Sequence, residues 1–407
     1  MRILMISRGD VFPPVHGAAV KIVRTAEAVA RLGHKVFFLS DDRGRYHLFH
    51  GGRHEIRPIA GGIAGDRMVG QRQEALLAAL GVPKDDRFLY SPMFDTGFWS
   101  RAINLARENS IEITHAEFPA FLVPALMARA VTGCPTVMVE HNVEYRRIRD
   151  SARISKEVQN RLKAWETSLC KMADRVITVS DNDRDILVRD SVRPSKISVI
   201  SHGVDLENYG GELTSRRRST RKRLGFDENE KIIIFHGVLN YPPNLHAVQR
   251  LALQILPRVL QKDHNARLLV VGDYPPKDLE QGNIMFTGCV APRDLAGIIA
   301  AADVAVVPLV GGGGTRMKIL EYFAAGVPVV STKKGAEGLA LSGNELVSAE
   351  SDREIADAVH GLLEKPKKAR ALSRRAKIWV KDYGWDDVAR QYVKMYREII
   401  RGGPLKT

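Results

Sequence analysis

Residues 303–331 read DVAVVPLVGGGGTRMKILEYFAAGVPVVS, which predicts a strand, a glycine-rich loop, a helix and a second strand in direct succession. The apolar, β-branched runs at the two ends are typical of buried parallel strands. Between them apolar residues recur at helical spacing, and Gly326 followed by Pro328 ends the helix. This order of elements indicates an α/β fold with a parallel sheet.

Two cations stand near the start of this helix, where the local electrostatics oppose them. Thr315 is a good N-cap residue, so Arg316 and Lys318 fall in the first helical turn. A helix N-terminus carries about half a positive charge, which makes basic side chains there unfavourable unless an anion joins them. The glycines at 311–314 let the backbone approach such an anion closely. The stretch therefore predicts a phosphate site, with Glu321 one turn further on as an acceptor for hydroxyl groups.

The same alternation of strands and helices runs through the whole chain in two series, which indicates two doubly wound α/β halves. The first series of strands is expected at residues 2–7, 35–40, 111–115, 136–141, 175–180 and 196–201. The second series is expected at residues 231–236, 267–272, 283–288, 303–308 and 328–331. Between them, residues 203–229 contain a glycine pair and an arginine run. We therefore expect an N-terminal domain at 1–205, a second domain at 206–383, and a final helix within 384–407 that returns to the first domain.

The 407 residues carry a formal charge of +14, which calls for an explanation. Basic residues gather in three clusters on helices that we expect to be exposed: Arg146, Arg147, Arg149 and Arg153; Arg216, Arg217, Arg218, Arg221, Lys222 and Arg223; and Lys365, Lys367, Lys368, Arg370, Arg374, Arg375 and Lys377. A solvated face, an anionic membrane leaflet and nucleic acid are the three candidate explanations. Aromatic residues make up 7% of the chain and do not interleave with these clusters, which disfavours nucleic acid.

The composition predicts a cytoplasmic protein, either soluble or peripheral at the inner face of a membrane. The three cysteines lack metal-ligand spacing, which fits a reducing compartment and predicts no zinc site. Residues 1–7 are expected to form a strand, because Arg8 and Asp10 end the apolar run before it reaches signal-peptide length. No run approaches the roughly 20 apolar residues that cross a bilayer.

Other local signals are weaker. No GxGxxG motif follows the first strand, although Gly17 and its small neighbours can bring backbone amides to an anion. Gly272 ends a strand and is either a turn glycine or a ligand contact. Asp41 and Asp42 also follow a strand, and a solvated turn is favoured there over a metal site.

Taken together, these motifs resemble the glycosyltransferase family 4 enzymes, which have the GT-B fold. The donor-binding half of the family is matched by residues 306–309, 311–314, 318–321, 324–332 and 335–339. Markers of its N-terminal half follow in order at residues 16–19, 32–36, 140–144, 173–180 and 202–205. The resemblance covers nearly the whole chain and implies two Rossmann-like domains that face a cleft. It also implies a retaining, metal-independent transfer of a sugar from a nucleotide diphosphate sugar, without a cofactor. The second domain would hold the donor and the first the acceptor.

Carried over position by position, the resemblance assigns roles to single residues. Glu321 matches the second glutamate of the family's Glu-x7-Glu motif, which binds the ribose hydroxyls. The first glutamate falls at Gly313, as in a branch whose loop reads GGGTRxKxLE, so the donor sugar is left open. The family's diphosphate-binding cations are missing after strand 231–236, and Arg316 and Lys318 are their substitutes. In the first domain the family's HxH pattern keeps His115, and Glu117 takes the second polar place.

The predicted site therefore has two groups of residues and no metal. The catalytic residues are His115, Glu117, Arg316 and Lys318. The donor-binding residues are Gly17, Gly237, Gly272, Gly313, Gly314, Thr315, Arg316, Lys318 and Glu321.

The function implied by the resemblance is glycosyl transfer in polysaccharide or glycoconjugate synthesis. Its partners would be a nucleotide-sugar donor and a glycan or lipid-linked acceptor, with an anionic membrane surface as a further partner and no nucleic acid. Two alternatives stay open within the fold: a nucleotide-sugar epimerase, which would need acid and base carboxylates from Glu117, Glu140 and Glu144, and a nucleotide-binding pseudoenzyme. A basic nucleic-acid-binding protein is the alternative from another class.

Overall fold

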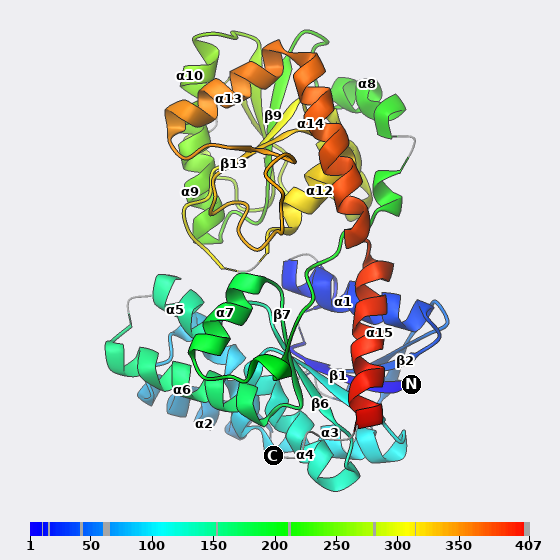
Figure 1. Cartoon of the computed structure of the whole chain (residues 1–407). Helices are drawn as coiled ribbons and strands as arrows, with labels where there is room; N and C mark the ends of the chain where they lie inside the picture. Colours follow the sequence, from blue (N-terminus) through cyan, green and yellow to red (C-terminus); the bar gives the residue numbers. More distant parts are fainter. Residues whose placement is uncertain are drawn as a thin grey trace. The chain divides into compact units, whose positions relative to one another are not determined.

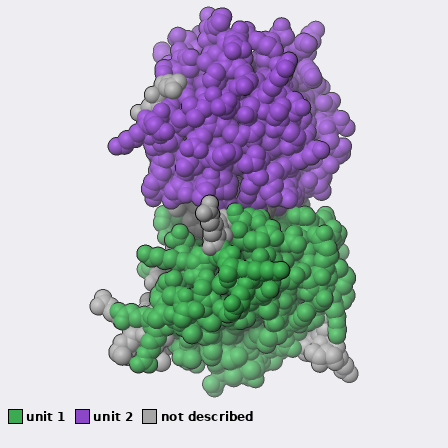
Figure 2. Space-filling model, turned by 90° about the vertical axis from the view of Figure 1, so that its left-hand side faces the viewer, with its two compact units in different colours: residues 1–202, 385–407 green, residues 203–384 purple. Residues whose placement is uncertain are grey.

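The computed structural model describes residues 1–9, 11–14, 17–40, 44–59, 66–151, 154–210, 213–279, 282–313 and 315–402. The chain divides into two compact units, which Figure 2 shows in different colours. Unit 1 comprises residues 1–202 and 385–407, and unit 2 comprises residues 203–384. The sequence placed the corresponding boundary after residue 205.

The described residues of unit 1 form a sheet in the order β4-β3-β2-β1-β5-β6-β7-β8 (Figure 1). Its strands are β1 (Arg2–Ser7), β2 (Lys35–Ser40), β3 (Arg45–His50), β4 (Arg53–Pro58), β5 (Ile113–Glu117), β6 (Thr136–Glu140), β7 (Arg175–Thr178) and β8 (Ile197–Val199). All pairs are parallel except β2 with β3 and β3 with β4. The parallel part was predicted, whereas the antiparallel edge hairpin was not.

The described residues of unit 2 form an all-parallel sheet in the order β11-β10-β9-β12-β13-β14. Its strands are β9 (Lys231–His236), β10 (Ala266–Val271), β11 (Ile284–Phe286), β12 (Val304–Val307), β13 (Val329–Ser331) and β14 (Val347–Ser348). The strands are rich in β-branched residues, and the side chains of β10 and β12 are almost all buried, as expected for a sheet covered on both faces. Two parallel α/β sheets confirm the predicted fold class.

Helices flank both sheets. Those of unit 1 are α1 (Gly17–Arg31), α2 (Asp66–Ala79), α3 (Thr96–Glu108), α4 (Leu122–Thr132), α5 (Glu144–Ser151), α6 (Lys156–Met172), α7 (Asp181–Arg189) and α15 (Trp385–Gly402). Those of unit 2 are α8 (Leu213–Arg223), α9 (Pro242–Arg250), α10 (Leu256–Leu260), α11 (Pro292–Ala301), α12 (Met317–Ala325), α13 (Asp352–Glu364) and α14 (Pro366–Trp379). A π-helical turn, Leu251–Ile255, joins α9 to α10.

The last helix of the chain, α15, belongs to unit 1 and packs against α1. The Arg31 guanidinium lies 2.7 Å from the Asp386 carboxylate, which ties the two helices together at the surface. Tyr392 and Tyr396 bury their rings on the inner face of α15. This helix therefore supplies part of the core of unit 1, and its Tyr396 hydroxyl contacts the Nδ1 atom of His115 in β5.

Candidate functional site

The glycine-rich loop connects β12 to α12 at the carboxyl edge of the unit 2 sheet, where open parallel sheets bind ligands. The prediction that Thr315 caps the helix is wrong: Arg316 occupies the N-cap position, and Thr315 lies buried before it. The physical reason is that Arg316 turns back into the loop. Its Nη2 donates to the carbonyl oxygen of Gly311 at 3.2 Å, and Nη1 donates to that of Gly313. Gly314 lies outside the described residues.

Gly312 shows why the loop needs glycine. Its φ is +91°, in the left-handed region that favours glycine. A Cβ at this position would lie 3.1 Å both from Arg316 Nη2 and from the Tyr241 hydroxyl oxygen. The loop is therefore packed closely around the Arg316 guanidinium, whose hydrogen bonds to the loop carbonyl groups hold its conformation.

Lys318 is placed beside the end of β9. Its Nζ donates to Asn244 Oδ1 at 2.9 Å and lies 3.9 Å from the centre of the Phe235 ring. Asn244 is itself fixed, because its Nδ2 donates to the carbonyl oxygen of Val238 at 2.9 Å. Burial, followed by the positive charge of Arg316, lowers the pKa of Lys318 to about 7. An anion next to Nζ would reverse that effect, because an opposite charge favours the ammonium form.

Glu321 lies one turn further along α12 and contacts β9. Its Oε2 accepts a hydrogen bond from His236 Nε2 at 2.8 Å. His236 is the last residue of β9, and its Nδ1 lies 2.9 Å from the Tyr322 hydroxyl. The loop, Lys318 and Glu321 thus gather around the end of one central strand.

Two further predicted donor-binding residues, Gly237 and Gly272, lie at the same edge and have a packing role of their own. A Cβ on Gly272 would lie 2.0 Å from the Gly237 carbonyl oxygen, so the turns after β9 and β10 can meet only without a side chain there. A Cβ on Gly237 would lie 3.0 Å from Lys318 Nζ. Gly237 therefore lies next to the Lys318 ammonium, whereas Gly272 packs against the backbone of Gly237.

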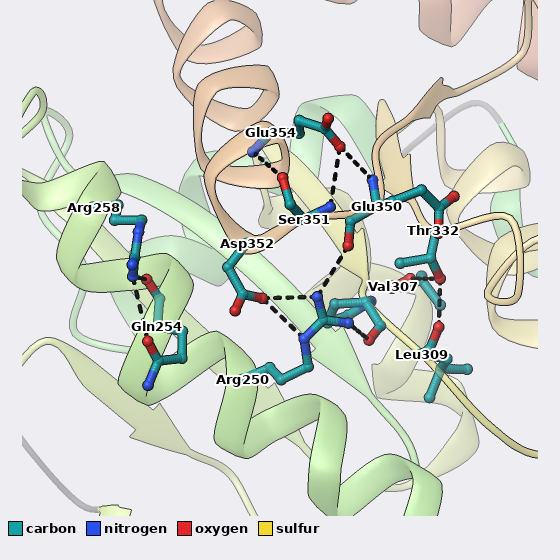
Figure 3. Close-up of polar contacts among 11 residues, drawn as sticks. Arg250, Gln254, Arg258, Val307, Leu309, Thr332, Glu350, Ser351, Asp352 and Glu354 are labelled. Carbon is teal, nitrogen blue, oxygen red and sulfur yellow. Dashed lines mark hydrogen bonds and ion pairs between the residues drawn. The ribbon is translucent and has the colours of Figure 1, made fainter.

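The chain just before the glycine-rich loop is held from two sides (Figure 3). Arg250, at the end of α9, donates from Nη1 to the carbonyl oxygen of Pro308 at 2.6 Å and from Nε to Asp352 Oδ1 at 2.9 Å. On the other side, Thr332 Oγ1 donates to the carbonyl oxygen of Leu309 at 2.5 Å. These bonds fix the point from which the loop departs.

In unit 1, Glu117 is the centre of a buried polar cluster at the end of β5. Both of its oxygens lie 2.8 Å from Lys21 Nζ, and the carboxylate also accepts from His115 Nε2 at 2.9 Å and His141 Nε2 at 2.7 Å. Burial alone would raise the pKa of Glu117, but Lys21 and the histidines outweigh it and hold the pKa well below its ordinary value. His115 Nδ1 also contacts the Tyr396 hydroxyl. The catalytic roles given to His115 and Glu117 stay predictions, since both side chains are fully enclosed and already bonded.

His141 received no role from the sequence, yet the structure places it in this cluster. It follows β6 directly, its ring stacks on Phe118 with centres 4.2 Å apart, and its Nε2 is oriented by Glu117. The signal that could have singled it out is a histidine immediately after a buried strand, at the functional edge of the sheet. Gly17 begins α1, four residues before Lys21, while Asp41 and Asp42 lie outside the described residues.

The basic clusters do not all lie on exposed faces, which corrects the sequence prediction. Arg147 of α5 is half-buried, 2.5 Å from Glu144 and 2.6 Å from Asp86, and Arg221 of α8 is 2.5 Å from Asp303. These side chains are held by acids that carry the opposite charge. The α14 cluster differs, because all of its members are exposed: Lys365, Lys367, Lys368, Arg370, Arg374, Arg375 and Lys377.

Comparisons with known proteins agree with this arrangement. Residues 15–208 match the family model described as Glycosyltransferase Family 4, and residues 230–365 match the model described as Glycosyl transferases group 1. The N-terminal half of the chain thus matches a glycosyltransferase family 4 domain, and the C-terminal half matches a group 1 glycosyltransferase domain. Among the residues that the structure describes, no helix is both long enough and apolar enough to cross a membrane.

Curated relatives are distant. The D-inositol 3-phosphate glycosyltransferase of Corynebacterium urealyticum is 26% identical over 50% of this chain and 52% of that protein. The chain thus spans about half the length of the inositol phosphate enzymes that it matches. The alpha-monoglucosyldiacylglycerol synthase of Streptococcus pneumoniae is 25% identical over 79% of this chain and 68% of that protein. The glycogen synthase of Mycobacterium tuberculosis is 24% identical over 99% of this chain and 96% of that protein.

Solved structures show the same fold over the full length. HepE of Anabaena in complex with UDP has a TM-score of 0.69 at 17% identity, covering 98% of this chain and 100% of that one. Sucrose-phosphate synthase of Thermosynechococcus elongatus has a TM-score of 0.72 at 18% identity, covering 99% and 100%. These likenesses confirm the GT-B fold.

Proposed function

We propose that the protein is a retaining glycosyltransferase that moves a sugar from a nucleotide diphosphate sugar to a hydroxyl of a glycan or lipid-linked acceptor. The observation that carries this proposal is the gathering of Arg316, Lys318 and Glu321 around a glycine-rich loop at the carboxyl edge of unit 2. Cations and loop amides suit a diphosphate, and a carboxylate suits ribose hydroxyls. HepE, a structural neighbour, is described in complex with UDP and with UDP-glucose, which supports a nucleotide-sugar donor.

In the proposed reaction, the bond between the anomeric carbon and the diphosphate oxygen breaks with its electron pair leaving on the diphosphate. The acceptor hydroxyl forms the new bond on the same face, and its proton passes to the departing diphosphate. Lys318 and Arg316 would neutralise the growing charge without a metal ion. Fixed donors of this kind contribute about 10² to 10³ in rate each.

For the acceptor we propose unit 1, at the edge where β5 and β6 end. His141, oriented by the buried Glu117 carboxylate, is the residue there that we expect to face a sugar hydroxyl. A lipid-linked acceptor is in keeping with the relative from Streptococcus pneumoniae, whose name describes a glycolipid synthase. A membrane-peripheral location for this chain is part of the same proposal.

An epimerase reaction is less well supported, because the carboxylates that it would use are engaged elsewhere. Glu117 carries three donors, and Glu144 lies 2.5 Å from the Arg147 guanidinium. Burial, with the charges of Glu166 and Glu144, raises the pKa of Glu140 well above its ordinary value. None of these three side chains is more than slightly exposed.

A thermal-shift panel of UDP, GDP, ADP and dTDP sugars tests the donor proposal first. A ligand at 100 times its dissociation constant adds about 2.7 kcal/mol of stability, so one nucleotide should raise the melting temperature clearly. The second measurement is release of the nucleoside diphosphate with and without added acceptor. Release that depends on the acceptor supports transfer, and donor binding without release would indicate a pseudoenzyme. No shift with any nucleotide would refute the proposal.

A further inference from the structure

We propose that His236 is the positioning residue for ribose recognition: it holds one carboxylate oxygen of Glu321 so that the other faces a ribose hydroxyl of the donor. This inference rests on the proposed function, because it presumes that unit 2 binds a nucleoside diphosphate. It concerns a residue of β9 that neither the sequence motifs nor the family resemblance assigned a role.

The geometry joins three side chains from two elements. His236 ends β9, while Glu321 and Tyr322 are neighbours on α12. His236 Nε2 lies 2.8 Å from Glu321 Oε2, and His236 Nδ1 lies 2.9 Å from the Tyr322 hydroxyl oxygen. The backbone N–H of His236 donates to the same hydroxyl at 2.9 Å. The two rings meet edge to face, with centres 5.0 Å apart.

These contacts indicate which nitrogen of the His236 ring donates to Glu321. A tyrosine hydroxyl has one O–H to donate and lone pairs with which to accept. Burial raises the pKa of Tyr322, so the hydroxyl stays protonated. A carboxylate oxygen can only accept a hydrogen bond, so the contact with Glu321 Oε2 requires a proton on His236 Nε2, while the Tyr322 O–H is free to donate to Nδ1. The proton therefore sits on Nε2, which donates to Glu321.

The consequence for Glu321 is a carboxylate with its two oxygens in different situations. Oε2 is held by His236, whereas Oε1 has no hydrogen-bond partner within the described part of the chain. The side chain is 23% exposed, so a ligand can reach it. Holding one oxygen stops the carboxylate from rotating and gives the other a fixed direction. Preorganised acceptors of this kind improve binding by reducing what must be ordered when the ligand arrives.

The simpler interpretation is that the contact between His236 and Glu321 only ties β9 to α12. Two substitutions distinguish the interpretations, since each replaces one end of the imidazole. In His236→Gln the amide nitrogen can take the place of Nε2 and still donate to Glu321. In His236→Asn the shorter amide reaches the position of Nδ1 and leaves Glu321 without its donor.

The experiment is a binding cycle by isothermal titration calorimetry. We compare the affinity for whichever of UDP, GDP and ADP binds most tightly with the affinities for its 2′-deoxy and 3′-deoxy analogues. The comparison is made in the parent, His236→Gln and His236→Asn, and the melting temperature of each protein is recorded. In the parent we expect removal of the recognised hydroxyl to weaken binding about 10- to 100-fold. In His236→Asn this ratio should shrink to below about threefold, and in His236→Gln it should return to within about threefold of the parent.

The outcomes separate the two levels of the proposal. If the parent binds neither these three diphosphates nor dTDP, the proposed function fails. If the parent binds but the ribose-to-deoxyribose ratio in His236→Asn equals that of the parent, positioning by His236 is wrong although nucleotide binding stands. Loss of affinity for all analogues by the same factor would indicate a structural tie only and would also overturn the inference.

Discussion

Replacing Lys318 by methionine tests whether a lysine has been kept at an electrostatically unfavourable place for the sake of an anion. Methionine keeps most of the side-chain volume beside Phe235 and removes the charge. Since one pKa unit corresponds to about 1.4 kcal/mol, the fall from 10.5 to about 7 sets an upper limit of about 5 kcal/mol on the cost of the ammonium. Solvent screening and the lost hydrogen bond to Asn244 reduce this, and we expect a net gain of about 1 to 2 kcal/mol in the variant below pH 7.

The gain should depend on pH in a defined direction. Between pH 7 and 10.5 the unfolded chain keeps the Lys318 proton while the folded protein has released it. Because the unfolded state then binds more protons, the free energy of unfolding of the parent rises with pH over this window. The Lys318→Met variant lacks this contribution, so its advantage in melting temperature should be largest below pH 7 and should narrow above it.

The catalytic activity of Lys318→Met should fall even though its stability rises. Turnover of the donor that gives the largest thermal shift should fall by about 10² to 10³ in Lys318→Met, with a smaller change in KM, because the ammonium acts most strongly as charge develops on the diphosphate. In the parent, affinity for the free diphosphate should weaken as pH rises above 7, while the variant should show no such slope. Lys222→Met, at an exposed lysine of α8, is the matched control. Near-normal turnover, or a variant less stable than the parent at pH 6, would refute the reasoning.

Three further predictions concern other parts of the molecule. Glu117→Gln should lower the free energy of unfolding, measured by chemical denaturation, by about 3 to 5 kcal/mol, because Lys21 becomes a buried charge without its partner. Adding Lys21→Met should recover part of this loss, and a double variant that shows the sum of two separate losses would contradict the prediction. Arg250→Met should lower stability by about 2 kcal/mol and weaken diphosphate binding, since the chain before the glycine-rich loop loses its anchor; unchanged binding would show that the loop is set elsewhere. Charge reversal of Lys367 and Lys368 should reduce sedimentation with anionic vesicles at low salt and leave donor hydrolysis unchanged, whereas equal vesicle binding would leave a solvated face.

The fold was predictable wherever burial on both faces made a strand continuously apolar. Strand β9 is such a case, and its predicted range is the observed one. The hairpin of β3 and β4 was missed for the opposite reason. β4 reads RHEIRP and is largely exposed, so its sequence carries no apolar alternation. An edge strand of this kind is defined by its pairing with a neighbour, and pairing leaves little trace in composition.

The candidate site was partly predictable because Arg316 and Lys318 are cations near a helix N-terminus, where positive charge is unfavourable, and the sequence alone reveals this. Broken rules of this kind are expected at functional sites. The hydrogen-bond partners of the site residues could not be predicted from the sequence. Asn244 lies 74 residues from Lys318, and His236 lies 85 residues from Glu321. No periodicity links positions so far apart, and the topology of the sheet alone brings them together. The N-cap error has a different origin, because the direction taken by Arg316 depends on the conformation of the neighbouring loop, whose carbonyl groups at Gly313 and Gly311 accept its hydrogen bonds.

The two units treat a buried charge in opposite ways, and the contrast indicates where a ligand is needed. In unit 1 the Glu117 carboxylate has three donors on its two oxygens, and its pKa is held low, so its charge is fully compensated by the protein. In unit 2 the Lys318 ammonium has three protons and, among the described residues, one hydrogen-bond acceptor, and its pKa is about 7. A compensated charge holds a structure together, whereas an under-compensated cation next to a glycine-lined loop is stabilised by an incoming anion. This contrast supports the proposal that the anionic part of the donor binds at Lys318, and we expect Glu117 to act mainly by orienting His141.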